Sequence, residues 1–129
     1  MSEQPFVLIC DDNKSVGDAL ALLLRNAGYR VQTVQEALQC FAVARKDRPA
    51  LILMDVMMPG MDGATASGLM DDIPELDHVP IVLISAMPED EVRERARDAG
   101  AAGYLLKPCP KDKLLETVRH WAGPLALPA

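Results

Sequence analysis

The chain has 129 residues, half of them hydrophobic, and a formal net charge of -6. This length suits one domain with a single core. The negative charge argues against direct binding to nucleic acid or to anionic membranes. No apolar run approaches the roughly 20 residues that a membrane span needs, and residues 1–5 are too short and too acidic for a signal peptide. We therefore expect a cytoplasmic protein.

Short apolar segments alternate with segments of helical spacing along the whole chain. In chain order, strands are predicted at residues 6–10, 30–34, 51–55, 81–84 and 104–106. Helices are predicted between Asn13 and Gly28 and at residues 36–46, 65–70, 89–99 and 111–121. The alternation predicts a doubly wound α/β domain with one five-stranded parallel sheet and helices on both faces.

The predicted helices differ in how well their ends and faces are defined. Asn13 or Ser15 is expected to cap the first helix. The third should be short or irregular, because Gly68 lies inside it and Pro74 limits its length. The helix at 89–99 has a thin apolar stripe, which fits a loosely held element. The last helix is expected to bury four side chains: Leu114, Leu115, Val118 and Trp121.

The three cysteines, Cys10, Cys40 and Cys109, are far apart and lack the spacing of a zinc site. We expect them to be reduced structural thiols.

Polar side chains follow four of the predicted strands, where ligands bind in open α/β sheets. They are Asp11 and Asp12, Asp55, Ser85, and Lys107. Two like charges about 5 Å apart at an effective dielectric of about 20 repel by roughly 3 kcal/mol, so clustered carboxylates call for a cation. Oxygen donors favour Mg²⁺, with Mn²⁺ as the alternative. Lys107 and Ser85 suit an anion held against the metal, and Asp55 could serve as a nucleophile in phosphoryl transfer.

These residues stand within motifs that resemble the receiver domain of two-component response regulators, the CheY-like proteins. The resemblance extends from Phe6 to about Trp121. It rests on the Asp11-Asp12 pair, the run MDVMMPGMDG at 54–63, Ile84-Ser85-Ala86, and Gly100 to Tyr104 leading to Lys107-Pro108. It implies a flavodoxin-like sheet of order 2-1-3-4-5 and one receiver domain over residues 1–129, with a core of about 6–122.

The resemblance also implies a role for each acidic residue. Asp55 would accept a phosphoryl group from the phosphohistidine of a sensor histidine kinase or histidine phosphotransfer protein. Asp12 and Asp55 would ligate Mg²⁺ directly, Asp11 directly or through water, and the main-chain carbonyl of Met57 would add a ligand.

The remaining motif residues would sense the phosphoryl group. Ser85, Ala86 and Lys107 would bind it, and the Lys107-Pro108 peptide bond is expected to be cis. Tyr104 matches the family's switch aromatic and would turn inward behind Ser85. The face formed by helix 89–99, strand 104–106 and helix 111–121 would then change, and a partner protein would bind it.

Other functions remain open at this point. A phosphatase of the haloacid dehalogenase type needs a second Asp where this chain has Met57, so we expect no enzyme beyond its own phosphorylation and dephosphorylation. A pseudo-receiver, or a receiver fragment of a hybrid kinase, would be a constitutive interaction module. A homodimer is also left open. Met57 and Met87 occupy positions that tune phosphoryl lifetime in the family, and neither orients water well, which predicts a long lifetime.

Overall fold

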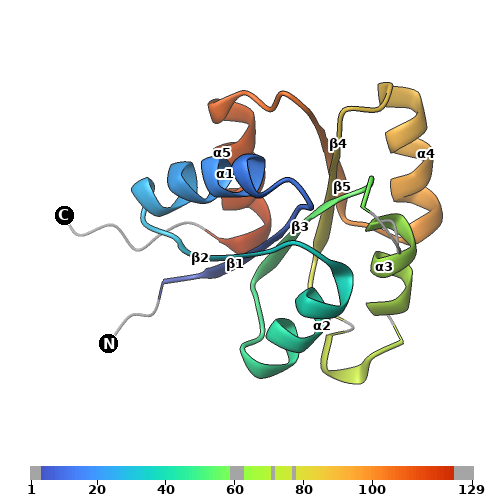
Figure 1. Cartoon of the computed structure of the whole chain (residues 1–129), viewed down its shortest axis with the longest axis horizontal. Coiled ribbons are helices and arrows are strands. Elements are labelled where there is room, and N and C mark those ends of the chain that lie inside the picture. The colour runs from blue at the N-terminus through green and yellow to red at the C-terminus, as the bar shows by residue number, and fades with distance from the viewer. Residues whose placement is uncertain (1–3, 59–62, 71, 77, 124–129) are drawn as a thin grey trace.

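The computed structural model describes residues 4–58, 63–70, 72–76 and 78–123. Strands and helices alternate along the chain (Figure 1). Within the described residues they are β1 (Phe6–Cys10), α1 (Lys14–Asn26), β2 (Arg30–Val34), α2 (Ala37–Lys46), β3 (Leu51–Asp55), α3 (Gly63–Met70), a 3₁₀ turn η1 (Pro74–Leu76), β4 (Ile81–Ser85), α4 (Glu89–Ala99), β5 (Gly103–Leu106) and α5 (Lys111–Ala122).

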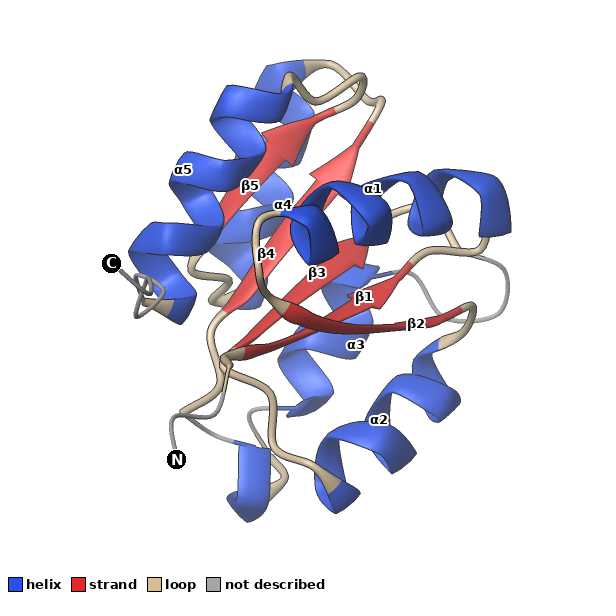
Figure 2. Ribbon diagram, turned by 90° about the vertical axis from the view of Figure 1, so that its left-hand side faces the viewer, coloured by secondary structure: helices blue, strands red, loops and turns tan. Residues whose placement is uncertain are grey.

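The strands form one parallel sheet of order β2-β1-β3-β4-β5, as predicted. The chain runs outward from β1 to the edge strand β2 and then returns past β1 to β3. This reversal puts α1 and α5 on one face of the sheet and α2, α3 and α4 on the other (Figures 1 and 2). The reversal between β1 and β3 also opens a crevice at their carboxyl ends.

The three central strands are buried along their whole length because helices cover both faces. Along β1, Val7 and Ile9 pack toward α1 and α5, whereas Leu8 and Cys10 pack toward α2, α3 and α4. The edge strand β2 instead has exposed and half-buried positions among its buried ones. A shift of one residue in β1 would therefore exchange two complete core layers and would move Asp11 from its place directly after the strand.

Local signals in the sequence set the start of α1 at the crevice and the ends of α1 and α4 at the opposite edge of the sheet. Asn13 caps α1, with its Oδ1 accepting the Val16 N–H at 3.2 Å. Gly28 after α1 has φ 102° and Gly100 after α4 has φ 70°. Both lie in the left-handed region, which glycine adopts without strain.

The prediction that Trp121 is buried is wrong, because its side chain is 38% exposed. Leu114 and Val118 are buried at a spacing of four, and the next position in that row is Ala122, which packs against the same core. Trp121 is one position earlier and turns outward, with its ring edge-on to His120 at 4.8 Å.

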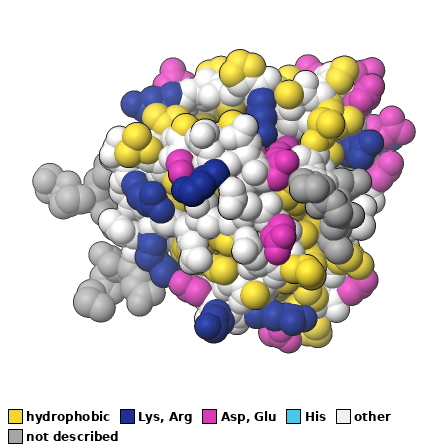
Figure 3. All heavy atoms as spheres, viewed as in Figure 1, with side chains coloured by type: hydrophobic (Ala, Val, Ile, Leu, Met, Phe, Trp, Pro, Cys, Tyr) yellow, Lys and Arg dark blue, Asp and Glu magenta, His cyan; other side chains and the backbone are white. Residues whose placement is uncertain are grey.

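Two other elements refine the predictions. α3 is short, and a Cβ built on Gly68 would meet open space, so this glycine is not required by packing. α4 rests on Val92 and Ala96 and exposes a charged outer surface, visible at the upper right of Figure 3. The 3₁₀ turn η1, which was not predicted, buries Leu76.

Part of the predicted loop, residues 59–62, and the tail from residue 124 lie outside the described residues. No helix within the described ranges combines the length and apolar character needed to cross a bilayer.

Candidate functional site

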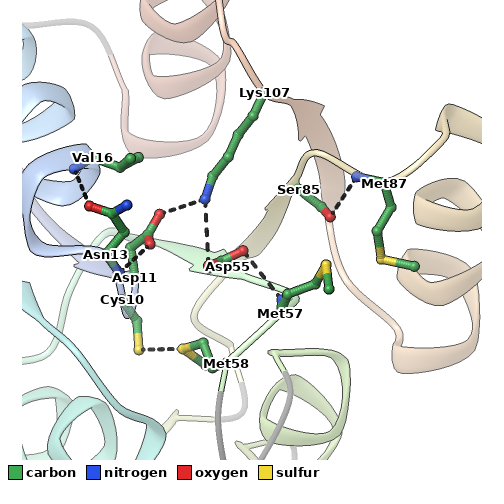
Figure 4. Close-up of polar contacts among 10 residues, drawn as sticks. All are labelled: Cys10, Asp11, Asn13, Val16, Asp55, Met57, Met58, Ser85, Met87 and Lys107. Atoms are coloured by element: carbon green, nitrogen blue, oxygen red, sulfur yellow. Dashed lines mark hydrogen bonds and ion pairs between the residues drawn. The ribbon is translucent and has the colours of Figure 1, made fainter.

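The structure brings the predicted polar residues together at the carboxyl edge of the sheet (Figure 4). Asp55 ends β3, Asp11 follows β1, and Lys107 follows β5. The Lys107 Nζ lies 2.9 Å from Asp11 Oδ2 and 3.5 Å from Asp55 Oδ2. One ammonium therefore bridges two carboxylates that come from separate strands.

Asp11 is held in one orientation by its neighbours. Its side chain is 1% exposed, and Oδ1 accepts the Asn13 N–H at 2.9 Å. Oδ2 is buried and, apart from the ion pair with Lys107, has no hydrogen-bond donor among the described residues. A buried carboxylate oxygen needs a partner, and this one relies on the Lys107 ammonium alone, which a cation could replace.

The charge on Asp55 is strongly perturbed. Burial and the nearby negative charge of Asp11 raise the pKa of Asp55 to about 7, although Lys107 and the Met57 N–H act in the opposite direction. For Lys107, burial acts to lower the pKa, but the hydrogen bond and charges of Asp11 and Asp55 outweigh burial and raise it. A carboxylate next to another carboxylate thus resists ionisation until more positive charge arrives.

The donor set fits a hard divalent cation. One carboxylate oxygen from each of Asp11, Asp12 and Asp55 lies within 4.8 Å of the others. Asp12 is exposed and the other two are buried, so the cluster opens to solvent on one side. Oxygen donors with an open side suit Mg²⁺, which keeps several of its waters. Met57 is the second residue after Asp55, and its N–H donates to Asp55 Oδ1 at 3.3 Å.

Ser85 and Ala86 lie at the end of β4, beside this cluster. Ser85 is buried, its Oγ accepts the Met87 N–H at 3.1 Å, and its carbonyl accepts the Lys107 N–H at 2.8 Å. Ala86 is exposed in the bend that follows. The Lys107-Pro108 peptide bond is cis. The ends of β4 and β5 are therefore tied together, and movement of one would affect the other.

Tyr104 makes contacts that the sequence did not reveal. Its hydroxyl donates to Glu89 Oε2 at 2.9 Å and accepts from Arg93 Nε at 3.3 Å, both on α4. Glu89 and Arg93, one turn apart on α4, also pair with each other at 3.8 Å. Only the packing of α4 beside β5 could reveal that Tyr104 joins them, since the tyrosine lies 15 residues from Glu89 in sequence.

Known proteins share this fold and sequence pattern. Residues 7–119 match the response regulator receiver domain family. The polar-differentiation response regulator DivK of Brucella anthropi is 30% identical over 117 residues, 91% of this chain and 95% of DivK. Response regulator PleD of Caulobacter vibrioides is 36% identical over 113 residues, which cover 88% of this chain and 25% of PleD.

A solved structure adds a metal to the comparison. The receiver domain of the sensor histidine kinase PA1611 from Pseudomonas aeruginosa PAO1 has a magnesium ion coordinated in its active site cleft. It is 30% identical to this chain with a TM-score of 0.85, over 95% of this chain and 100% of that domain. The chain therefore belongs to the response regulator receiver domain family, whose members are the phosphoacceptors of two-component signalling systems.

Proposed function

We propose that Asp55 is the residue of this receiver domain that accepts the phosphoryl group. The observation that supports this most directly is the position of Lys107 Nζ, which contacts the carboxylates of both Asp11 and Asp55. Asp55 ends a buried central strand and is 4% exposed, so its carboxylate is held firmly at the crevice. Positioning and charge neutralisation provide most of the catalysis in phosphoryl transfer.

Asp11, Asp12, Asp55 and the main-chain carbonyl of Met57 would hold the Mg²⁺, with Mn²⁺ as an alternative. The cation would neutralise charge on the oxygens of the transferred group. A carboxylate oxygen of Asp55 attacks phosphorus, the bond between phosphorus and the donor's imidazole nitrogen breaks, and the imidazole leaves. Lys107 pairs with the phosphoryl oxygens in place of its present carboxylate partners.

The same residues would report the modification to the surface. Phosphorylation adds about -1.5 to -2 charge at the strand ends. Ser85 and the Ala86 N–H would bind the new oxygens, with the Ser85 hydroxyl donating its proton to one of them. Tyr104 would leave Glu89 and turn inward, changing the α4–β5–α5 face. The phosphoryl group shifts the population because it contacts one arrangement better than the other.

This assignment leads to proposals about the partners of the domain and the residues that form it. The donor would be a sensor histidine kinase or a histidine phosphotransfer protein, and a downstream protein would bind the α4–β5–α5 face. A homodimer through that face is the alternative. We further propose that residues 1–129 act as one receiver domain, with a core of about 6–122, and catalyse only their own phosphorylation and dephosphorylation.

Acetyl phosphate with Mg²⁺, followed by intact mass spectrometry, tests the assignment. The unmodified chain should gain the mass of one phosphoryl group and then stop, whereas Asp55→Asn should gain none. Asp72→Asn changes an exposed carboxylate outside the cluster and should behave like the parent chain. Full modification of Asp55→Asn would show that another residue is the acceptor.

A further inference from the structure

Met57 is a large apolar residue that stands in solvent beside the carboxylate cluster. It is 62% exposed, although it comes directly after the buried Val56. Its backbone N–H donates to Asp55 Oδ1 at 3.3 Å, which fixes the start of the side chain next to Asp55 (Figure 4). Met58, the next residue, is 7% exposed, and its sulfur accepts the Cys10 thiol at 3.5 Å. Two neighbouring thioethers therefore have opposite surroundings.

Exposure makes Met57 the first target for an oxidant among the methionines that the structure describes. The others are buried or half-buried: Met54, Met58, Met70 and Met87. An oxidant must reach the sulfur atom itself, so accessibility decides which thioether reacts. Met57 and Met87 line a surface hollow of about 420 Å³, which leaves room for an added oxygen.

We propose that Met57 is a site of reversible oxidation to methionine sulfoxide by hydrogen peroxide, and that the sulfoxide shortens the lifetime of the phosphoryl group on Asp55. The effect on lifetime rests on the proposed function of Asp55, whereas the oxidation does not. The thioether sulfur attacks one oxygen of the peroxide, the O–O bond breaks, and the second oxygen leaves as water with both protons. The sulfur loses two electrons and the peroxide gains them. A methionine sulfoxide reductase reverses the change with electrons from thiols.

The sulfoxide changes the hydrogen bonding that is available beside Asp55. A thioether sulfur is a weak acceptor, whereas a sulfoxide makes the side chain polar, with an oxygen that accepts strongly. Loss of the phosphoryl group requires a water to attack phosphorus, and a nearby acceptor can hold that water and draw on its proton. The hydrogen bond from the Met57 N–H keeps this side chain close to Asp55. Oxidation would therefore speed hydrolysis while Lys107 and the acidic side chains stay unaltered.

The cysteines are the other groups that peroxide could oxidise. Cys10 and Cys40 are fully buried, and Cys109 is half-buried, with the pKa of its thiol raised by burial. A raised pKa leaves little of the reactive thiolate at neutral pH. Dithiothreitol reverses disulfides and sulfenic acids but leaves methionine sulfoxide in place, so a reductant separates the two kinds of oxidation.

The experiment treats the full chain with hydrogen peroxide until its intact mass shows the gain of one oxygen, and then adds dithiothreitol. Peptide mapping should find the sulfoxide on Met57 ahead of the other described methionines. Treated and untreated chains are then phosphorylated with acetyl phosphate and Mg²⁺, the acetyl phosphate is removed, and mass spectrometry follows the decay. We expect the oxidised chain to lose phosphate at least about threefold faster. Methionine sulfoxide reductase should restore the slow decay.

Two variants assign the effect, each compared with its own untreated form. Met57→Leu has an apolar side chain of similar size that cannot be oxidised, so peroxide should leave its decay rate unchanged. Met87→Leu removes the half-buried thioether of the same hollow and should still respond to peroxide as the parent chain does. Circular dichroism checks that each treated chain is folded.

Three results would overturn the proposal. The first is a peptide map in which another described methionine is oxidised before Met57. The second is a decay rate that oxidation of Met57 does not raise. The third is a response to peroxide that persists in Met57→Leu or disappears in Met87→Leu. Failure of the proposed function looks different, because the untreated chain would then take up no phosphoryl group. That result would remove the effect on lifetime, and the peptide map would still decide whether Met57 is the oxidation site.

Discussion

Replacement of Asp55 by Asn should stabilise the chain when no divalent cation is present. Asp55 lies in a buried position beside Asp11, and these surroundings raise the pKa of Asp55 from 3.8 to about 7. The folded state therefore holds this proton more tightly than the unfolded state does. Stability should fall as the pH rises from about 4 to about 7 and remain level above that. Asparagine has nearly the same shape, carries no charge and can still accept the Met57 N–H.

The size of the effect follows from the two pKa values. A difference between 3.8 and about 7 corresponds to at most about 4 kcal/mol at high pH. The crevice is open to solvent through the exposed Asp12, and screening reduces this figure. We expect Asp55→Asn to raise the free energy of unfolding by about 2 kcal/mol at pH 8. The gain in stability from Asp55→Asn should become small near pH 4.5, where Asp55 of the folded parent chain keeps its proton.

Urea unfolding in EDTA, followed by circular dichroism at pH 8 and pH 4.5, measures this difference. Asp72→Asn is the control, because its carboxylate is exposed and should change stability little at either pH. Added Mg²⁺ should stabilise the parent chain more than Asp55→Asn, since the cation relieves the same repulsion. The reasoning fails if Asp55→Asn is no more stable than the parent chain at pH 8. It also fails if the variant gains as much stability over the parent at pH 4.5 as at pH 8.

Three more changes test other parts of the site. Lys107→Ala leaves two buried carboxylates without their ammonium and should lower the free energy of unfolding by about 3 kcal/mol in EDTA. Urea unfolding with Mg²⁺ should show a smaller loss of stability, and an equal loss would contradict the shared site. Met57→Asn combined with Met87→Glu places polar groups where water would attack the phosphoryl group, so the phosphorylated chain should lose phosphate several-fold faster. Mass spectrometry follows the loss, and an unchanged rate would count against a role for the two thioethers. Glu89→Gln weakens the hold on the Tyr104 hydroxyl, so ¹⁹F NMR of fluorotyrosine-labelled protein should show more inward Tyr104; an unshifted signal would mean that this contact does not restrain the ring.

Much of the fold could be predicted because its signals are local. The central strands are continuous apolar runs, and Asn13, Gly28 and Gly100 mark helix ends by their own chemistry. Parallel strands bring their carboxyl ends to one edge, so Asp55 and Lys107 were expected to lie close together before any distance was known.

Other features depend on how elements pack and could not be predicted from spacing. The outward turn of Trp121 arises because Ala122 takes the inward position of the last turn of α5. The contact between Tyr104 and α4 arises from the packing of α4 beside β5. The 3.5 Å contact between the Cys10 thiol and the Met58 sulfur is a third case, because it joins the end of β1 to the segment after β3.

The account depends most on Asp55 and Lys107 sharing one phosphoryl group with a metal. A crystal structure of the chain grown with Mg²⁺ and beryllofluoride, a stable mimic of the phosphoryl group, tests this directly. We predict beryllofluoride bonded to a carboxylate oxygen of Asp55, with its fluorines contacting Lys107 Nζ and the Ser85 hydroxyl and with Mg²⁺ held by Asp12 and Asp55. Beryllofluoride bonded to a residue other than Asp55 would contradict the account. So would beryllofluoride bonded to Asp55 while Lys107 stays paired with Asp11 and makes no contact with the fluorines.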